Sequence, residues 1–187
     1  MAFIPPYPPL AARGNVFHGT TAVGGVNIPA SNSTSPTFGL WNPAGSGKNA
    51  TLIQIKFGWV STTGTPGAIT YNLLTGAGSA IATAAPISAF TAGTPTNGIA
   101  GGAIAIASVM KFTPSAATLT TAAAIYGGSG LSQLTTTGAT TGATYFTMVD
   151  RFDGLMIVAP GSFWYPTGTA APGSVTTIEL IWSEDPV

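Results

Sequence analysis

The chain has 187 residues and a mass of 18.6 kDa, which fits a single domain with a sizeable core. Five cationic and five acidic residues leave only 5% of it charged, which excludes a nucleic-acid binder that neutralises phosphates. The absence of cysteine excludes disulfide scaffolds and thiolate metal sites. Gly contributes 25 residues and Pro 15, and this composition excludes coiled coils and predicts an all-β chain.

Long parts of the chain carry no charged side chain and no histidine, namely residues 57–110 and 112–149. Two interpretations stay open: a Thr, Ser and Gly surface that hydrates well, or, as we favour, a surface that other subunits cover. The longest apolar tract, near residues 98–109, is shorter than the roughly 20 residues of a membrane span. The first residues lack the regions of a secretion signal. We therefore expect synthesis in a cytosol and no membrane partner.

Residues 1–15 differ from the rest and are predicted to form an extended arm ahead of one domain over residues 16–187. Proline removes backbone donors and fixes φ, so prolines between apolar side chains favour a stiff, polyproline-like segment. Such an arm can dock on another subunit at a small entropic cost, which we expect here; packing on its own domain and disorder are the alternatives. The docking residues are predicted to be Phe3, Ile4, Pro5, Pro6, Tyr7, Pro8, Pro9 and Leu10.

Alternation of apolar and polar residues predicts β-strands from about Val16 onward, most clearly over 52–59 and 175–182. Their apolar faces are predicted to hold Ile53, Ile55, Phe57 and Trp59 in the first and Ile178, Leu180 and Trp182 in the second. Further strands are predicted over 69–73, 103–112, 145–149 and 155–158. The unbroken apolar run 155–158 is typical of a strand that is buried on both faces.

Turn-forming residues separate these runs, and we predict that Asp150–Gly154 is a turn between two strands. About eight to ten short strands then indicate an all-β fold, a jelly-roll-like antiparallel β-sandwich. The low-complexity stretches 76–101 and 113–142 are expected to be long loops that make subunit contacts, form an exposed apex or are tolerated insertions. A helix is weakly indicated near residues 116–125, where the Thr content argues against it.

No motif predicts a catalytic residue, a metal or a cofactor. Residues 45–48, Gly-Ser-Gly-Lys, match the end of a phosphate-binding loop, but Asn42 and Asn49 occupy positions that require Gly and Ser or Thr. We therefore predict a turn before a strand. His18, the only histidine, is expected to be structural or exposed.

Two groups of acidic residues are candidate chemical sites, Asp150 with Asp153 and Glu184 with Asp185. Paired carboxylates could hydrolyse a glycosidic bond or bind calcium. We favour a surface turn for the first pair, with Arg151 as its partner, and an exposed chain end for the second.

The tryptophans could form a platform for stacking sugars, but Trp59 and Trp182 lie on apolar strand faces and are core candidates. Phe163, Trp164 and Tyr165 are consecutive, so their side chains must project to both faces of a strand. One side is then either exposed or covered by a neighbour. We predict that these three form a subunit interface; a place in the core and a ligand platform are the alternatives.

A family resemblance lies in residues 155–165 (LMIVAPGSFWY), in residues 175–186 with their Ile-Trp-Ser-Glu, and in residues 40–48 (LWNPAGSGK). They resemble small virion-surface proteins of tailed bacteriophages, which are capsid decoration (cement) proteins or head-fibre components. The resemblance spans roughly residues 36–75 and 150–186. It implies a jelly-roll-like structural protein, a homotrimer on the capsid surface of the virion, synthesised in the host cytoplasm. Its arm would lie across the major capsid protein, its second partner.

Two other functional classes stay open beside this resemblance. A tail-fibre or receptor-binding protein would direct its long loops at a host glycan, with Trp164 or Tyr126 stacking on the sugar. A glycan-cleaving enzyme would use Asp150, Asp153 or Glu184.

Overall fold

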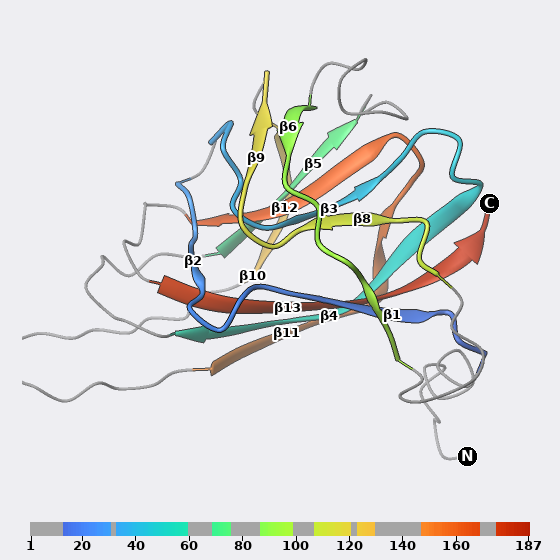
Figure 1. The fold of residues 1–187 in the computed structure, drawn as a ribbon, viewed down its shortest axis with the longest axis horizontal. Helices are drawn as coiled ribbons and strands as arrows, with labels where there is room; N and C mark the ends of the chain where they lie inside the picture. The colour runs from blue at the N-terminus through green and yellow to red at the C-terminus, as the bar shows by residue number, and fades with distance from the viewer. Residues whose placement is uncertain are drawn as a thin grey trace, which may run out of the picture.

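The computed structural model describes residues 13–30, 33–59, 69–75, 87–98, 107–120, 123–129, 147–168 and 175–187. Within these residues there is no helix, and thirteen strands follow one another along the chain (Figure 1). The docking arm predicted over Phe3 to Leu10 lies outside the described residues. The strands are β1 (Val16–Thr20), β2 (Val26–Asn27), β3 (Gly39–Asn42), β4 (Lys48–Trp59), β5 (Ile69–Thr75), β6 (Ile87–Phe90), β7 (Thr96–Asn97), β8 (Lys111–Thr113), β9 (Ala117–Leu119), β10 (Ala124–Ser129), β11 (Thr147–Val158), β12 (Ser162–Gly168) and β13 (Val175–Pro186).

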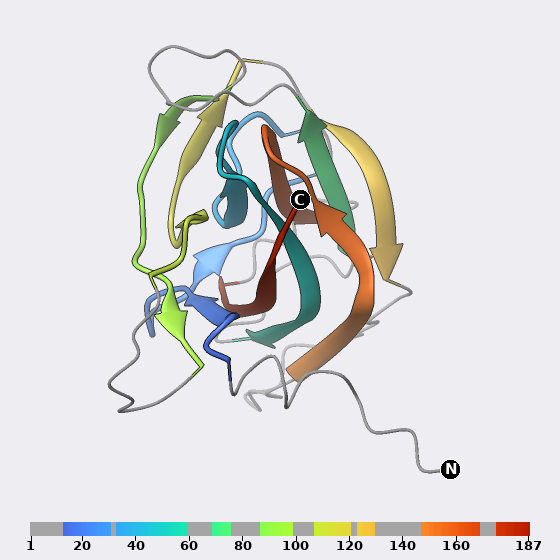
Figure 2. The ribbon, with the colours of Figure 1, turned by 90° about the vertical axis from the view of Figure 1, so that its right-hand side faces the viewer.

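Two antiparallel sheets pack against each other, as Figure 2 shows from the side. Sheet A has the strand order β11-β4-β13-β1-β7, with β2 also paired to β13, and sheet B has the order β10-β5-β12-β3-β8. The chain passes repeatedly from one sheet to the other. For example, β3 and β5 lie in sheet B while β4 lies in sheet A, and β11 and β13 lie in sheet A while β12 lies in sheet B. The predicted all-β antiparallel sandwich is confirmed, and a jelly-roll winding stays a prediction.

The main core lies between sheets A and B and follows the predicted alternation. Ile55 and Phe57 of β4 and Leu180 and Trp182 of β13 are fully buried, while the residues between them face outward. Each buried side chain of this size stabilises the fold by about 1.5–3 kcal/mol before entropy costs. The alternation over these residues therefore sets the register of the two strands in this part of sheet A. It breaks at Ile53, which was predicted on the same face as Ile55: Leu52 beside it is fully buried, and the pairing of β4 with β13 shifts between Ile181 and Trp182.

A second core covers the outer face of sheet B. The two-stranded sheet formed by β6 and β9 packs there, with Phe90 and Leu119 against Trp41 and Phe163. Since this sheet belongs to the same chain, sheet B is buried on both of its faces at this place.

This second core overturns the predicted subunit interface of Phe163, Trp164 and Tyr165. All three side chains have 0% exposure within one chain. Trp164 points into the main core, while Phe163 and Tyr165 point into the second core under β6 and β9. The aromatic run does project to both faces, but the neighbour that covers the outer face is the chain itself.

Strands also occur inside the two stretches that were predicted as long loops. β6 and β7 lie within 76–101, and β9 and β10 lie within 113–142, in the region where a helix was weakly indicated. Conversely, the strand predicted over 103–112 is reduced, among its described residues, to the start of β8 at Lys111.

The predicted turn over Asp150–Gly154 is wrong, because β11 runs unbroken through it. The pairing with β4 jumps from Arg151 opposite Gln54 to Met156 opposite Leu52, so residues 152–155 form a bulge. Asp153 and Gly154 have φ of 47° and 80°, the left-handed conformation that a turn pair supplies. Asp153 and Gly154 do adopt a turn-like backbone conformation, but it bends one strand instead of joining two strands.

Candidate functional site

One side of the sandwich ends in β10 of sheet B and β11 of sheet A, as Figure 2 shows. In the described part of the chain, no strand pairs with the outer edge of either. Six large apolar side chains are exposed among the described residues, and four of them lie on these two strands. These four, here called the apolar edge, are Ile125, Val149, Leu155 and Ile157.

The bulge in β11 presents the most prominent member of the apolar edge. Leu155 lies within it and is 89% exposed, and Ile157 follows two residues later on the same face. The prediction that 155–158 is a strand buried on both faces is therefore wrong, since only its even-numbered residues face the core. On β11 the exposed Arg151 and Asp153 lie between Val149 and Leu155, so two charges interrupt the apolar edge. Exposed apolar residues on unpaired edge strands are typical of surfaces that bind another protein.

The charged side chains are distributed very unevenly. All five acidic residues lie on β11 and β13, and three of the five cations lie on β4 and β11, so sheet A carries eight of the ten charges. The other two cations are Arg13, before β1, and Lys111 of β8. The side of the molecule formed by sheet B and by β6 and β9 is therefore almost neutral in its described residues, so an apolar or neutral partner could cover it without desolvating charges.

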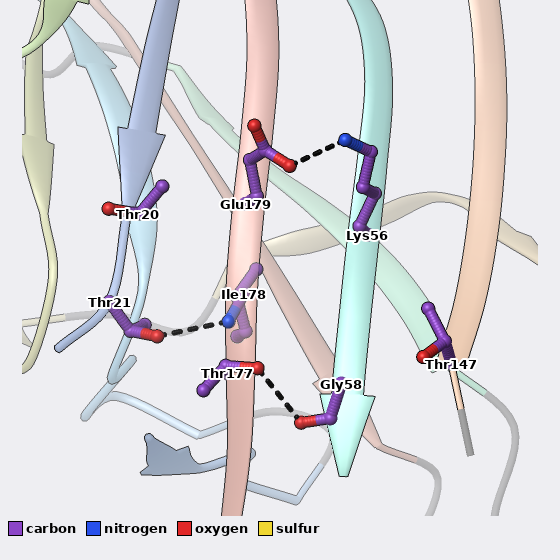
Figure 3. A pocket seen from close by; sticks show the side chains of 8 residues that line it. All are labelled: Thr20, Thr21, Lys56, Gly58, Thr147, Thr177, Ile178 and Glu179. Carbon is purple, nitrogen blue, oxygen red and sulfur yellow. Dashed lines mark hydrogen bonds and ion pairs between the residues drawn. The ribbon is translucent and has the colours of Figure 1, made fainter. Parts of the chain in front are cut away.

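The outer face of sheet A has a hollow of about 310 Å³, drawn in Figure 3. Gly58 lies at an outward position of β4 and has no side chain. Thr177 Oγ1 lies close beside it, 2.7 Å from where a Cβ would be, and donates a hydrogen bond of 3.1 Å to the Gly58 carbonyl oxygen. Around the hollow lie residues of β1, β4, β11 and β13 and the residue after β1. The lining residues are Thr20, Thr21, Lys56, Gly58, Thr147, Thr177, Ile178 and Glu179.

An ion-pair cluster forms one wall of this hollow. Lys56 Nζ lies 2.7 Å from Glu179 Oε2, and His18 Nδ1 lies 3.2 Å from Glu179 Oε1. Burial acts to raise the pKa of Glu179, but hydrogen bonds from Lys56 and His18 and their positive charges lower it below its ordinary value. The carboxylate is therefore ionised at neutral pH, and His18 acts as its structural partner.

Glu184 is the clearest error of the charge predictions. It was expected at an exposed end of the chain, but it lies in β13 with 1% exposure. Its carboxylate pairs with Lys48 and accepts hydrogen bonds from Ser108 Oγ, Val109 N and Trp182 Nε1. The sequence showed the charge but not the segment 107–110 that closes over it.

The acidic residues weighed for glycoside hydrolysis do not meet in a cleft. Asp150 accepts a hydrogen bond of 2.8 Å from Tyr71 Oη and pairs in register with Ile55, whereas Glu184 pairs with Ala50. Five residues along β4 correspond to roughly 16 Å, and the carboxylates of glycosidases lie at most about 9.5 Å apart. Asp153 lies on the exposed bulge. Among the described residues, no group of three His, Cys, Asp or Glu could hold a metal ion.

The remaining predicted residues are placed as follows. Gly45 and Gly47 have φ of 82° and 68° just before β4, which confirms the predicted turn. Trp182 lies in the main core, as predicted. Trp164 is buried and cannot stack on a sugar, while the side chains of Trp59 and Tyr126 lie outside the described ones.

No protein-family model, no curated protein and no solved structure matches this chain. The described residues contain no helix that is long and apolar enough to cross a bilayer. The apolar faces predicted for 52–59 and 175–182 imply that Lys56 and Glu179, which lie between those residues, face outward, but they do not reveal the hollow. The signal that could have revealed it is Gly58, a glycine inside a strongly alternating strand, which often marks a close approach.

Proposed function

We propose that this chain is a structural virion protein, a capsid decoration (cement) protein of a tailed bacteriophage that binds the lattice of the major capsid protein as a homo-oligomer. The observation that carries the proposal is the apolar edge on β10 and β11. The resemblance of residues 155–165 and 175–186 to virion-surface proteins supports it, and so does the neutral side formed by sheet B, β6 and β9.

Weak contacts become strong binding when an oligomer repeats them. Burying one side chain such as Leu155 contributes about 1.5–3 kcal/mol, which alone gives little affinity after the entropy cost of association. A homo-oligomer presents several copies of the same surface, so the second and third contacts form at a high effective concentration. A trimer with three apolar arms would in this way clamp a shell without any chemistry.

The test is binding of the purified chain to expanded phage capsids, measured by co-sedimentation. We expect the full chain to sediment with the capsids. A variant that lacks residues 1–12 should lose capsid binding and keep the oligomeric state of the full chain in analytical ultracentrifugation. A chain that is a monomer at high concentration, or a full chain that does not sediment with capsids, would falsify the proposal. A deletion variant that still binds capsids would contradict docking by the arm and leave the apolar edge as the docking surface.

The same deletion separates this function from a receptor-binding protein. A receptor-binding protein would bind host cells or their glycans, and removal of residues 1–12 would not change that binding. Binding to cells without binding to capsids therefore contradicts the decoration function.

A further inference from the structure

The hollow on sheet A is built by the register of three neighbouring strands. Gly58 of β4 is paired with Thr147 of β11 on one side and with Thr177 of β13 on the other. Two residues along, Lys56 is paired with Glu179. Across the sheet, the set of paired residues that contains Gly58 therefore lies next to the set that contains the cation Lys56 and the anion Glu179. Figure 3 shows the hydroxyl and charged groups around Gly58.

Several polar groups of this wall keep hydrogen-bonding capacity. The Lys56 side chain is 39% exposed, and its ammonium has three donors, of which one bonds to Glu179 within the described part of the chain. The two carboxylate oxygens of Glu179 each accept one bond and can accept more, with the side chain 29% exposed. The hydroxyls of Thr20 and Thr147 lie on exposed residues at the two sides of the hollow.

The charge of the wall restricts which ligand can bind. Lys56 and Glu179 neutralise each other, so a single anion would meet the carboxylate and a single cation would meet the ammonium. A neutral ligand whose hydroxyl groups both donate and accept hydrogen bonds matches both charges at once. The volume of about 310 Å³ lies at the lower end of small-molecule sites, about 300–1,000 Å³, so it suits a small unit.

We propose that this hollow binds a saccharide, one sugar unit at a time, with Lys56 and Glu179 as its hydrogen-bonding pair and Gly58 as its floor. No aromatic side chain lines the hollow among the described residues, so the stacking that strengthens many sugar sites is missing there. A single site then has an affinity in the range of about 1 mM. Copies within an oligomer would raise the avidity. The proposal does not depend on capsid binding.

The test is saturation-transfer-difference NMR on the full chain. The probes are the methyl glycosides of glucose, galactose, mannose and N-acetylglucosamine, each at about 5 mM, a concentration above the expected dissociation constant. Sodium phosphate and glycine serve as competitors that represent anions and zwitterions. The variants are Lys56→Met, Glu179→Gln and Thr147→Val, with Lys111→Met as the matched control, since Lys111 is an exposed lysine on the other sheet.

We expect at least one glycoside to receive saturation. The affinity should fall about tenfold or more in Lys56→Met and Glu179→Gln, the loss that one hydrogen bond to a charged group produces. It should fall less in Thr147→Val and stay unchanged in Lys111→Met. Three results would overturn the proposal. They are no saturation transfer to any glycoside, glycoside binding by the Lys56 and Glu179 variants that equals that of the original chain, and displacement of the bound glycoside by phosphate or glycine. Thr147→Val lies at an exposed position, so it tests the site even where a charge variant folds poorly.

Discussion

Lys48 Nζ lies 3.4 Å from Oε2 of Glu184, and the side chain of Glu184 has no exposure to solvent. The same carboxylate binds Ser108, Val109 and Trp182, so one buried charge joins β4, β13 and the segment 107–110. A buried charge of this kind is costly to leave without partners, and so are the donors around it.

Glu184→Ala removes this shared acceptor. We expect the free energy of unfolding to fall by about 3–5 kcal/mol, because the Lys48 charge and the donors of Ser108 and Trp182 lose their partner. Urea unfolding followed by tryptophan fluorescence measures this. Asp185→Ala, at the next position and half-buried, is the control and should cost about 0–1 kcal/mol. Equal losses in the two variants would contradict the role of Glu184.

The left-handed conformation of Asp153 makes its bulge selective for residue type. Asp153→Val should lower the free energy of unfolding by about 1–2 kcal/mol, since a branched side chain is strained at a φ of 47°. Asp153→Asn should be nearly neutral, because asparagine tolerates this region. Arg151→Val, exposed on the same strand without a positive φ, is the comparison. An equal effect of valine at both positions argues against strain at residue 153.

Phe163→Ala distinguishes a core residue from an interface residue. Phe163 is fully buried under β6 and β9, so we expect a loss of about 3–5 kcal/mol from the cavity. Because the contact is within one chain, the loss should be the same at low and high protein concentration. If the free energy of unfolding falls only at concentrations where the chain is oligomeric, Phe163 lies in a subunit interface.

The apolar edge is tested by placing a charge on it. Leu155→Asp should weaken self-association or capsid binding at least about tenfold, since the substitution removes apolar burial and adds a charge to be desolvated. Sedimentation velocity over a concentration series measures the first and co-sedimentation the second. Val23→Asp is the matched control, because Val23 is 93% exposed and lies before β2, away from β10 and β11. If the two variants behave alike, the apolar edge is not the docking surface.

The Glu179 cluster predicts how stability depends on pH. The pKa of Glu179 is lower in the folded chain than its ordinary value, so the unfolded chain takes up the proton at a higher pH. The carboxylate therefore stabilises the fold above the ordinary pKa of about 4.3, and this contribution is lost as the pH falls through the lower folded value.

Glu179→Gln removes that titration. The stability difference between the original chain and the variant should be largest above about pH 5 and shrink as the solution is acidified through the range near pH 4. Thermal unfolding in a series of buffers measures it. A difference that grows on acidification would show that the carboxylate is not held in its charged form by Lys56 and His18.

The central strands could be predicted from the sequence because one of their faces is apolar and the other polar. In β4 and β13 the side chains of Ile55, Phe57, Leu180 and Trp182 are buried as the alternation required. The strands β6 and β9 could not be found in this way, since their Ala- and Thr-rich stretches show little contrast between faces. Their packing on Phe163 is a contact between distant parts of the chain.

The edge strand shows the limit of reading burial from composition. Residues 155–158 are all apolar, and the sequence alone favours burial on both faces, yet Leu155 and Ile157 are exposed because β11 ends sheet A. Likewise, the alternation of these strands implies that Lys56 and Glu179 face outward, but their pairing depends on the register of β4 against β13. Position within a sheet and strand register are long-range properties, which periodicity does not carry.

The place of β13 between β4 and β1 has a consequence for biogenesis. β1 and β4 both pair with β13, which the ribosome makes more than a hundred residues after β4. Neither strand can form this pairing before β13 has been made. Until then sheet A is incomplete and the apolar faces of these strands are not stably buried. Completing the sheet requires contacts between distant parts of the chain, which form late and slowly. We therefore expect nascent chains halted before Val175 to be captured by chaperones or degraded, and native structure to arise only after β13 has emerged.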